Sequence, residues 1–340
     1  MTAATAQAPV ATPDPVVSIL VVSYNTRAMT LECLASVIAE TRVPYELIVL
    51  DNASPDDSAS AIAAEFPDVR LIASRENHGF AKGNNLAARE ARGRYLLLLN
   101  PDTLVLDGAI DRLVAFAART PEAGIWGGRT LKGDRSLDPI CAFGDQTLWS
   151  IFCRTTGLAR IFGNSALFNS ELYGGWARDS EREVDVVQGC FLLVERRLWD
   201  VLGGFDPIFG TYGEEADLCW RARARGSRPR MTPEAVIVHY GGASSRRHAD
   251  KQVLVLKGRM TLIRHHLPGW QQPAAGVLLR LWPLSRMLGA RLMAPLHPGL
   301  AEAAAHWSVV WRRRAEWRNG IGENVPRAEH SCRTADTAGG

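Results

Sequence analysis

Hydrophobic and polar positions form blocks of two different periods along the first 120 residues. Short runs of branched aliphatic residues that end in polar residues are typical of strands buried in a parallel sheet. Between them, apolar residues three or four positions apart predict amphipathic helices. The predicted strands cover residues 16–25, 46–52, 69–74 and 94–100, and the predicted helices cover residues 26–40, 58–66, 82–92 and 108–118. Repeats of this length predict right-handed crossovers and a layered α/β sheet.

The pattern weakens over residues 120–180, where glycine and aromatic residues favour loops and an edge hairpin over the sheet. It returns over residues 184–205 as two strands and a short helix closed by two glycines. A helix over residues 214–225 and a strand over residues 234–242 follow. Ser54 is the expected cap of the second helix. We therefore expect one large α/β domain.

The last hundred residues differ from the rest in charge. The chain carries a net charge of +3, but residues 246–318 contain thirteen lysines or arginines and three acidic residues, a net charge of +10. Five of the ten tryptophans lie there too. This composition predicts a helical extension with an anionic partner. The expected organisation is a loose tail (1–15), the α/β domain (16–245), the basic extension (246–318) and a second tail (319–340).

The apolar stretch 274–296 is interrupted by three arginines, and Pro283 is expected to kink it. No run of 18 uncharged apolar residues exists, so a conventional spanning helix is not expected. A basic amphipathic segment favours the plane of a membrane surface. Two alternatives remain, a helix that docks against the α/β domain and a dimer seam. We expect no nucleic-acid partner.

Several common chemistries lack their sequence patterns. The six cysteines form no C-x-x-C pair and do not cluster with histidine, so buried free thiols in a reducing cytosol are expected. The N-terminus lacks the basic and apolar regions of a secretory signal. The phosphate-binding P-loop, HExxH, GxGxxG and GxSxG are also absent, which removes the main support for common NTPases, metalloproteases, dehydrogenases and hydrolases.

Polar residues directly follow the apolar runs at the ends of four predicted strands, at the edge where open α/β sheets bind ligands. They are Ser23, Tyr24 and Asn25; Asp51 and Asn52; Asn100 and Asp102; and His239 and Tyr240. Singly, Asp51, Asp102 and His239 also fit turn, cap or core roles. Together, the carboxylate of Asp102 and the imidazole of His239 suit an exchangeable Mg²⁺ or Mn²⁺ whose shell is completed by phosphates.

Two further segments carry candidate chemistry. Residues 77–85 form a glycine-containing loop before a helix, and their backbone amides and Lys82 are candidates to face a diphosphate, or only to close the loop on the sheet. Glu214 and Glu215 begin a predicted helix. They complement the helix dipole in one interpretation and provide a general base in the other.

Six sequence blocks together resemble the family 2 inverting glycosyltransferases, and in particular a rhamnosyltransferase-like bacterial branch. The resemblance covers residues 16–245. Its blocks are SILVVSYN, ELIVLDNAS, NHGFAKGNN, LLLLNPDT, the long block from VVQGC to RARARG, and VHYGG. It implies the GT-A fold, a three-layer α/β sandwich, here with a mainly helical basic C-terminal extension.

The resemblance also implies an activity and its partners. A sugar would pass from a nucleotide sugar to a hydroxyl of a glycan or polyprenyl-diphosphate-linked acceptor in cell-envelope polysaccharide synthesis. Rhamnose from dTDP-rhamnose is the favoured donor sugar, and uridine-diphosphate sugars come next. The enzyme would use Mg²⁺ or Mn²⁺ and would lie in the cytoplasm, bound to the inner face of the cell membrane.

Roles for individual residues follow from the same resemblance. Asp102 matches the second acid of the family's metal-binding Asp-x-Asp motif, in which Asn100 here replaces the first, and His239 resembles a metal-binding histidine. Glu215 lies at the position of the base, with Glu214 or Asp217 still open. The residues expected to bind the nucleotide sugar are Ser23, Tyr24, Asn25, Asp51, Asn77, Gly79, Lys82, Asn84, Asn100 and Asp102.

Two other functions stay open at this point. The first is a sugar-1-phosphate nucleotidyltransferase, which has a similar sheet. In that class a glycine-rich, arginine-containing loop is expected directly after the first strand, where this chain has SYNTR. A catalytically idle membrane scaffold is the second, because Asn100 removes one expected acid. The preferred interpretation requires that Asp51, Asp102, Glu215 and His239 line one cavity.

Overall fold

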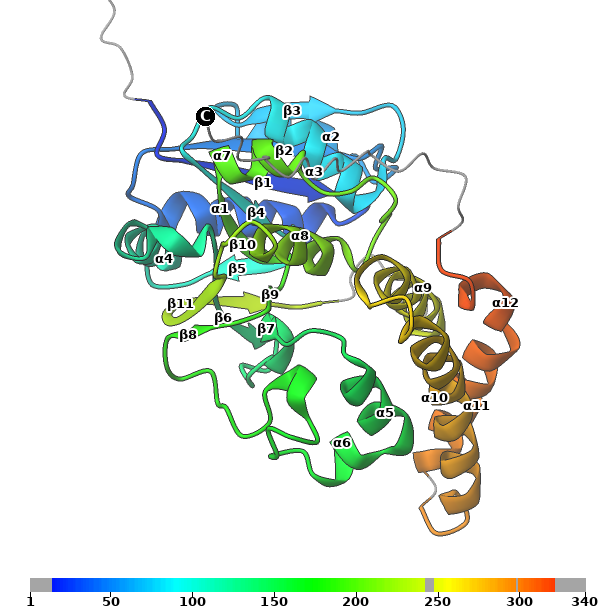
Figure 1. Cartoon of the computed structure of the whole chain (residues 1–340). Helices are drawn as coiled ribbons and strands as arrows, with labels where there is room; N and C mark the ends of the chain where they lie inside the picture. Colours follow the sequence, from blue (N-terminus) through cyan, green and yellow to red (C-terminus); the bar gives the residue numbers. More distant parts are fainter. Residues whose placement is uncertain (1–13, 242–247, 298, 322–340) are drawn as a thin grey trace, which may run out of the picture.

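The computed structural model describes residues 14–241, 248–297 and 299–321, and a mixed β-sheet lies at its centre (Figure 1). Within this part of the chain the strand order is β3-β2-β1-β4-β10-β6-β11-β5, with β8 paired to β11. The strands of this sheet are β1 (Val17–Ser23), β2 (Tyr45–Asp51), β3 (Arg70–Ala73), β4 (Tyr95–Leu99), β5 (Thr103–Val105), β6 (Ile125–Lys132), β8 (Arg182–Glu183), β10 (Phe191–Glu195) and β11 (Arg230–His239). Two short strands, β7 (Ala142–Phe143) and β9 (Val186–Val187), pair separately.

Helices cover both faces of this sheet and extend beyond it. The helices of the α/β part are α1 (Arg27–Glu40), α2 (Ser58–Glu65), α3 (Gly79–Arg89), α4 (Ala109–Arg119), α7 (Arg196–Leu202) and α8 (Glu214–Arg223). The others are α5 (Leu148–Thr156), α6 (Leu158–Ile161), α9 (His248–His266), α10 (Gln272–Met293), α11 (Gly299–Arg312) and α12 (Arg314–Trp317). One apolar core joins the sheet to α1, α2 and α4, and a second joins it to α3, α7 and α8. The three-layer sandwich is therefore confirmed.

The four predicted N-terminal strands form the parallel half of the sheet. β1 pairs in parallel with β2 and β4, and β2 with β3. The aliphatic side chains of β1, β2 and β4 are buried on both faces, as their continuous apolar runs predict, whereas those of the edge strand β3 are only partly buried. Ser23 lies opposite Asp51 in the register, so the polar ends of β1 and β2 meet at one edge. Beyond β4 the sheet is mixed, because β10 runs antiparallel to both β4 and β6.

The expectation of loops over residues 120–180 was wrong in two places. β6 is an interior strand between β10 and β11. Its Gly127 and Gly128 let neighbouring atoms approach closely, since an added Cβ would lie 2.5 Å from Val187 and 2.3 Å from the carbonyl oxygen of Ala235. These glycines hide the strand pattern. The other missed element is α5, which begins with a capping box between Thr147 and Ser150.

The predicted cap at Ser54 was also wrong. α2 begins at Ser58, four residues later, and Asp57 lies at its N-cap position. Ser54 instead joins two loops, because its hydroxyl accepts a hydrogen bond from the backbone N–H of Asn25 and its own N–H donates to Asp51. The turn after β2 is therefore longer than its sequence suggested.

The C-terminal helices dock against the α/β domain, one of the two alternatives to a membrane-surface role. Helices α9 to α12 share an apolar core with α5. Trp282 and Trp317 are buried in this core and Trp307 packs against it, whereas Trp270 is exposed. α10 continues as a helix through Pro283. The expected tails and the boundary near residue 245 lie almost entirely outside the described residues.

Five cysteines are buried as free thiols, as predicted: Cys33, Cys141, Cys153, Cys190 and Cys219. Burial raises the pKa of Cys33 and Cys219 to about 12. These thiols are therefore unreactive at neutral pH. Cys332 lies outside the described residues.

Candidate active site

A cavity of about 870 Å³ opens at the carboxyl ends of β1, β4 and β11, and α9 forms its opposite wall. Eight of the predicted site residues line it: Tyr24, Asn77, Gly79, Asn100, Asp102, Glu214, Glu215 and His239. The other five do not line it: Ser23, Asn25, Asp51, Lys82 and Asn84. Three of the four residues required to share one cavity therefore do so, and Asp51 does not.

Asp102 and His239 lie side by side because β5 and β11 are paired. Thr103 is opposite His239 in the antiparallel register, and the backbone N–H of Tyr240 donates to the Asp102 carbonyl. The His239 Nε2 lies 3.2 Å from the Asp102 Oδ1. Burial alone would lower the pKa of His239, but the Cys190 thiol and the Asp102 carboxylate outweigh it and raise this pKa to about 11.

Asn100 completes this corner of the cavity. Its Nδ2 lies 3.4 Å from the His239 Nε2, and its Oδ1 is buried without a hydrogen-bond partner. No group of three His, Cys, Asp or Glu side chains that could hold a metal ion occurs in the described part of the chain. However, the amide oxygen of Asn100 is also a hard donor. With it, the carboxylate of Asp102 and the imidazole of His239, once the imidazole has lost its proton, make a donor set that fits Mg²⁺ or Mn²⁺.

Asp51 lies beside the cavity instead of on its wall. Its side chain is buried, with Oδ2 accepting from the backbone N–H of Ser54 and Oδ1 left without a partner. The adjacent Asn52 does line the cavity. Ser23 is buried in a hydroxyl cluster with Thr26 and Thr30. The role of Asp51 in binding a nucleotide base stays a prediction.

The loop before α3 does not offer its amides to a ligand. The N–H of His78 donates to Asn52, that of Gly79 to Asn77, and that of Phe80 to the carbonyl oxygen of Gly210. Lys82 is exposed outside the cavity. The interpretation as an anion-binding loop was therefore wrong, because the protein itself already satisfies these donors. The same holds for Asn84, which is buried and donates to the Phe80 carbonyl.

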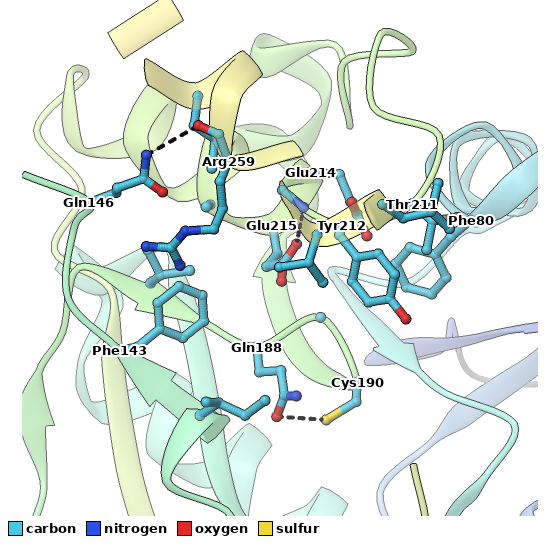
Figure 2. Close-up of a pocket in the computed structure, with 18 of the residues that line it drawn as sticks. Phe80, Phe143, Gln146, Gln188, Cys190, Thr211, Tyr212, Glu214, Glu215 and Arg259 are labelled. Atoms are coloured by element: carbon cyan, nitrogen blue, oxygen red, sulfur yellow. Dashed lines mark hydrogen bonds between the residues drawn. The ribbon is translucent and has the colours of Figure 1, made fainter. Parts of the chain in front are cut away.

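The two adjacent glutamates project from a strained turn (Figure 2). Tyr212 and Gly213 both have positive φ, at 73° and 104°, and α8 begins directly after them. Non-glycine residues seldom adopt this conformation, and such strain is common at functional sites. The Gly213 N–H donates to the Glu215 Oε2 at 3.3 Å, whereas the Glu214 Oε2 is buried without a partner.

Burial governs the protonation of this pair. It raises the pKa of Glu215, and burial together with the charge of Glu215 raises the pKa of Glu214 well above its ordinary value of 4.5. Asp217, the third candidate base, does not line the cavity. Its carboxylate accepts from Arg221 at 2.7 Å and contacts His266 at 2.9 Å, and its pKa is lowered. Asp217 therefore serves the packing of α8 against α9.

Helix α9 holds the strained turn from behind. A Cβ on Gly258 would lie 2.2 Å from the carbonyl oxygen of Tyr212, so only glycine allows the helix this close. The extension is thus part of the wall that positions Glu214 and Glu215.

Sequence reasoning missed most of the wall opposite the strand ends. The missed residues are Phe143, Gln146, Arg154, Glu171, Trp220, Arg259 and His266, among others. They belong to no local motif. The one available signal was the concentration of basic and aromatic residues after position 246.

Comparison with known proteins identifies the first half of the α/β part. Residues 18–140 match the family model described as glycosyl transferase family 2. This part of the chain is a family 2 glycosyltransferase domain. It contains the ends of β1, β2 and β4 and the loop before α3, which form one side of the cavity.

Relatives of the glycosyltransferase domain extend the match beyond residue 140. The O-antigen biosynthesis protein RfbC of Myxococcus xanthus is 29% identical over 245 residues, 69% of this chain and 18% of that protein. An N-acetylglucosaminyl-diphospho-decaprenol L-rhamnosyltransferase of Mycobacterium tuberculosis is 26% identical over 250 residues, 68% of this chain and 78% of that enzyme. This chain therefore spans about a fifth of the first protein and over three quarters of the second.

A solved structure shares the fold of the glycosyltransferase domain and most of the extension. It is the mannosyltransferase PcManGT from Pyrobaculum calidifontis in complex with GDP-Man and Mn²⁺. It superimposes with a TM-score of 0.56 at 19% sequence identity, covering 90% of this chain and 88% of that one. In the described ranges, no helix is both long and apolar enough to cross a membrane.

Proposed function

We propose that the chain is an inverting glycosyltransferase that moves a sugar from a nucleotide sugar to a hydroxyl of a polyprenyl-diphosphate-linked acceptor. Rhamnose from dTDP-rhamnose is the first donor to test, and the product belongs to cell-envelope polysaccharide synthesis. The observation that carries the proposal is a single cavity in which Asp102 and His239 face a second acidic group, Glu214 and Glu215.

Each group has a definable task in such a reaction. The acceptor hydroxyl attacks the anomeric carbon opposite the departing nucleoside diphosphate, which inverts the configuration. Glu215 takes the hydroxyl proton, and its raised pKa brings it closer to working pH. Asp102, His239 and Asn100 would hold a divalent cation, which when bound offsets the charge that develops on the leaving diphosphate.

Three comparisons support these assignments. The Mycobacterium tuberculosis relative is named for a rhamnosyl transfer to a diphospho-decaprenol acceptor, and the Myxococcus xanthus relative for O-antigen biosynthesis. The structural neighbour was solved with a nucleotide sugar and Mn²⁺. A divalent cation and an activated sugar are therefore the first ligands to test.

The decisive experiment has two readouts. Purified protein is screened for thermal stabilisation by a panel of nucleotide sugars with Mn²⁺, since a preferred ligand raises stability by mass action. The best donor is then incubated with a synthetic prenyl-diphospho-N-acetylglucosamine, and products are resolved by mass spectrometry. A disaccharide and free nucleoside diphosphate support transfer. Release of inorganic diphosphate from a nucleoside triphosphate would support a nucleotidyltransferase instead, and no turnover with any donor would support an idle scaffold.

We also propose that the protein binds the membrane through α10 and α6. Four apolar residues on one face of α10, at intervals of four, seven and four residues, are between 42% and 79% exposed: Val277, Leu281, Leu288 and Leu292. Arg280 and Arg291 are exposed beside this stripe. At the same end of the molecule in Figure 1, the end of α6 adds exposed Ile161 and Phe162. Exposed apolar residues with flanking arginines favour an anionic lipid surface.

Vesicle binding tests this surface directly. We expect sedimentation with phosphatidylglycerol vesicles that weakens with added salt. Replacing Leu288 and Leu292 by aspartate should abolish it, whereas Val201→Asp, at an equally exposed valine of α7, should not. Equal loss in the control, or no wild-type binding at low salt, would exclude the proposed surface.

A further inference from the structure

Two arginines share one buried glutamate on the cavity wall. Glu171, in the short 3₁₀ helix Ser170–Leu172, accepts from both terminal nitrogens of Arg259 at 2.6 and 2.8 Å. It also accepts from the Nε of Arg154 at 3.2 Å. The three side chains are only 8–23% exposed and come from α5, the 3₁₀ helix and α9. All three line the same cavity as Glu215.

This cluster carries an unbalanced positive charge. Burial alone would raise the pKa of Glu171, but Arg154 and Arg259 hold it down at about 2. The carboxylate is therefore ionised at neutral pH, and two guanidinium groups against one carboxylate leave a net charge of +1. A buried charge without a counter-charge is unfavourable. In addition, the Nε of Arg259 is buried without a hydrogen-bond partner.

The nearby acidic pair does not supply the missing negative charge. Within the described residues, no ion pair joins Glu214 or Glu215 to either arginine. The pKa of both glutamates is raised, whereas an arginine partner would lower it. The arrangement therefore leaves room for an anionic ligand.

The position of the cluster separates this anion from the donor diphosphate. In Figure 2, Arg259 and Phe80 lie on opposite sides of Glu215. Phe80 belongs to α3 in the matched 18–140 segment, which also supplies Asn100 and Asp102 to the cavity. Arg154 and Arg259 come instead from residues after the 18–140 family match. An anion bound by them would belong to the acceptor.

The walls near the cluster are apolar as well as cationic. α9 lines the cavity with Val255 and Leu262 on the face that carries Arg259, with Leu254 beside this face, and with Lys251 two turns away. Across the cavity, Ile140 and Phe143 add apolar surface. A ligand that joins a diphosphate to a hydrocarbon chain matches both properties.

We propose that Arg259 and Arg154 bind the phosphate oxygens of a prenyl-diphosphate-linked acceptor and so orient its sugar hydroxyl toward Glu215. This inference rests on the proposed function. Guanidinium groups suit phosphate because they offer planar, paired N–H donors. The arginines are positioning residues in this account, and they take no part in proton transfer.

Binding of farnesyl diphosphate in the absence of donor tests the inference. We expect the affinity to fall about tenfold to a hundredfold in Arg259→Gln, the range for a lost hydrogen bond to a charged group. Arg259→Lys should lose less. Arg264→Gln, at an exposed arginine of the same helix, should bind like the wild type. Inorganic diphosphate should compete with farnesyl diphosphate, and farnesol should not bind.

A charge test separates ligand binding from a structural role. Glu171→Gln keeps the size of the side chain but raises the net charge of the cluster from +1 to +2. We expect Glu171→Gln to bind farnesyl diphosphate more tightly than the wild type, even if its melting temperature is lower. If the cluster has only a structural role, Glu171→Gln should be less stable and should not bind farnesyl diphosphate more tightly. If Glu171→Gln does not fold, the comparison of Arg259→Gln with Arg259→Lys still tests the proposal.

Two results would overturn the inference: no binding of farnesyl diphosphate by the wild type, or unchanged binding of farnesyl diphosphate by Arg259→Gln. Because donor and turnover are absent, these results are independent of the transfer reaction. In the complete reaction, Arg259→Gln should raise the KM for the acceptor and leave the KM for the donor unchanged. Transfer that proceeds with an unchanged acceptor KM would refute the subsite and leave the proposed function intact.

Discussion

The two ends of the cavity are built in different ways. At the proposed donor end, Asn100 and Asp102 lie between β4 and β5 and His239 ends β11, so that strand pairing brings them together. At the other end, Arg154 and Arg259 are brought to one glutamate by the packing of α5 against the C-terminal helices. Short local sequence patterns predict the first end, whereas the second end depends on packing between residues far apart in the chain.

This difference has a functional consequence. One fold can host many activities, because function is determined by the sites that a common scaffold carries. Here the wall that carries Arg154 and Arg259 comes from outside the matched 18–140 segment, and α9 also holds the turn with Glu214 and Glu215. In the proposed reaction, the extension would therefore contribute both to the acceptor subsite and to the position of Glu215.

The largest expected effect lies between the two ends, at Glu215. Glu215→Gln removes the proton acceptor but keeps the shape, so we expect kcat to fall about 10²–10⁴-fold, the usual contribution of a general base. The KM for both substrates should change little. Steady-state kinetics with the best donor and acceptor measure the effect.

Glu214→Gln is the matched control for this substitution. Glu214 is fully buried, and its neighbour is the more accessible of the two. We expect the control to keep kcat within about tenfold of the wild type, below the range for a general base. A larger loss in Glu214→Gln than in Glu215→Gln would reverse the assignment.

The donor end was the more predictable of the two. The strand–helix alternation and the polar strand ends located Asn100, Asp102 and His239 correctly on one wall. Asp51 showed the limit of this reasoning, since a strand-end position does not determine whether a side chain lies on the cavity wall or beside it. The anion-binding prediction for the loop before α3 failed for a related reason. The backbone amides of this loop donate hydrogen bonds to Asn52 and Gly210, and no local pattern reveals these partners.

The second prediction concerns the metal at the donor end. Asp102→Asn and His239→Ala should each weaken Mn²⁺ binding by at least about 10–100-fold, the loss that even outer-shell changes produce. The measurement is thermal stabilisation by Mn²⁺ in the presence of nucleoside diphosphate. Asn100→Asp should have the opposite effect and tighten Mn²⁺ binding, because it adds a charged oxygen ligand. Unchanged Mn²⁺ dependence in all three variants would remove the metal from this corner.

The third prediction tests the contact between the extension and the base. Gly258→Val would force α9 away from the Tyr212 carbonyl, with a loss of about 1–3 kcal/mol in stability and a lower kcat. Gly289→Ala in α10 is the control, since its added Cβ meets no atom within 4 Å. It should stabilise the helix by about 0.5–1 kcal/mol. If Gly258→Val melts lower but keeps a normal kcat, α9 supports the fold without positioning the turn.

The smallest expected effect is a pH dependence of stability at Glu214. Its pKa is raised in the folded protein by burial, by Glu215 and by Asp217. The folded state therefore binds the carboxyl proton more tightly than the unfolded state does. The stability that this proton contributes is present below pH 4.5 and is lost as the pH rises through the raised pKa. Glu214→Gln mimics the protonated form at every pH. The variant should melt about 2–4 °C higher than the wild type at neutral pH, a shift that roughly 1 kcal/mol produces in a domain of this size. The difference should vanish in acid, and a lower melting point for the variant at neutral pH would mean that the charged carboxylate has a stabilising partner.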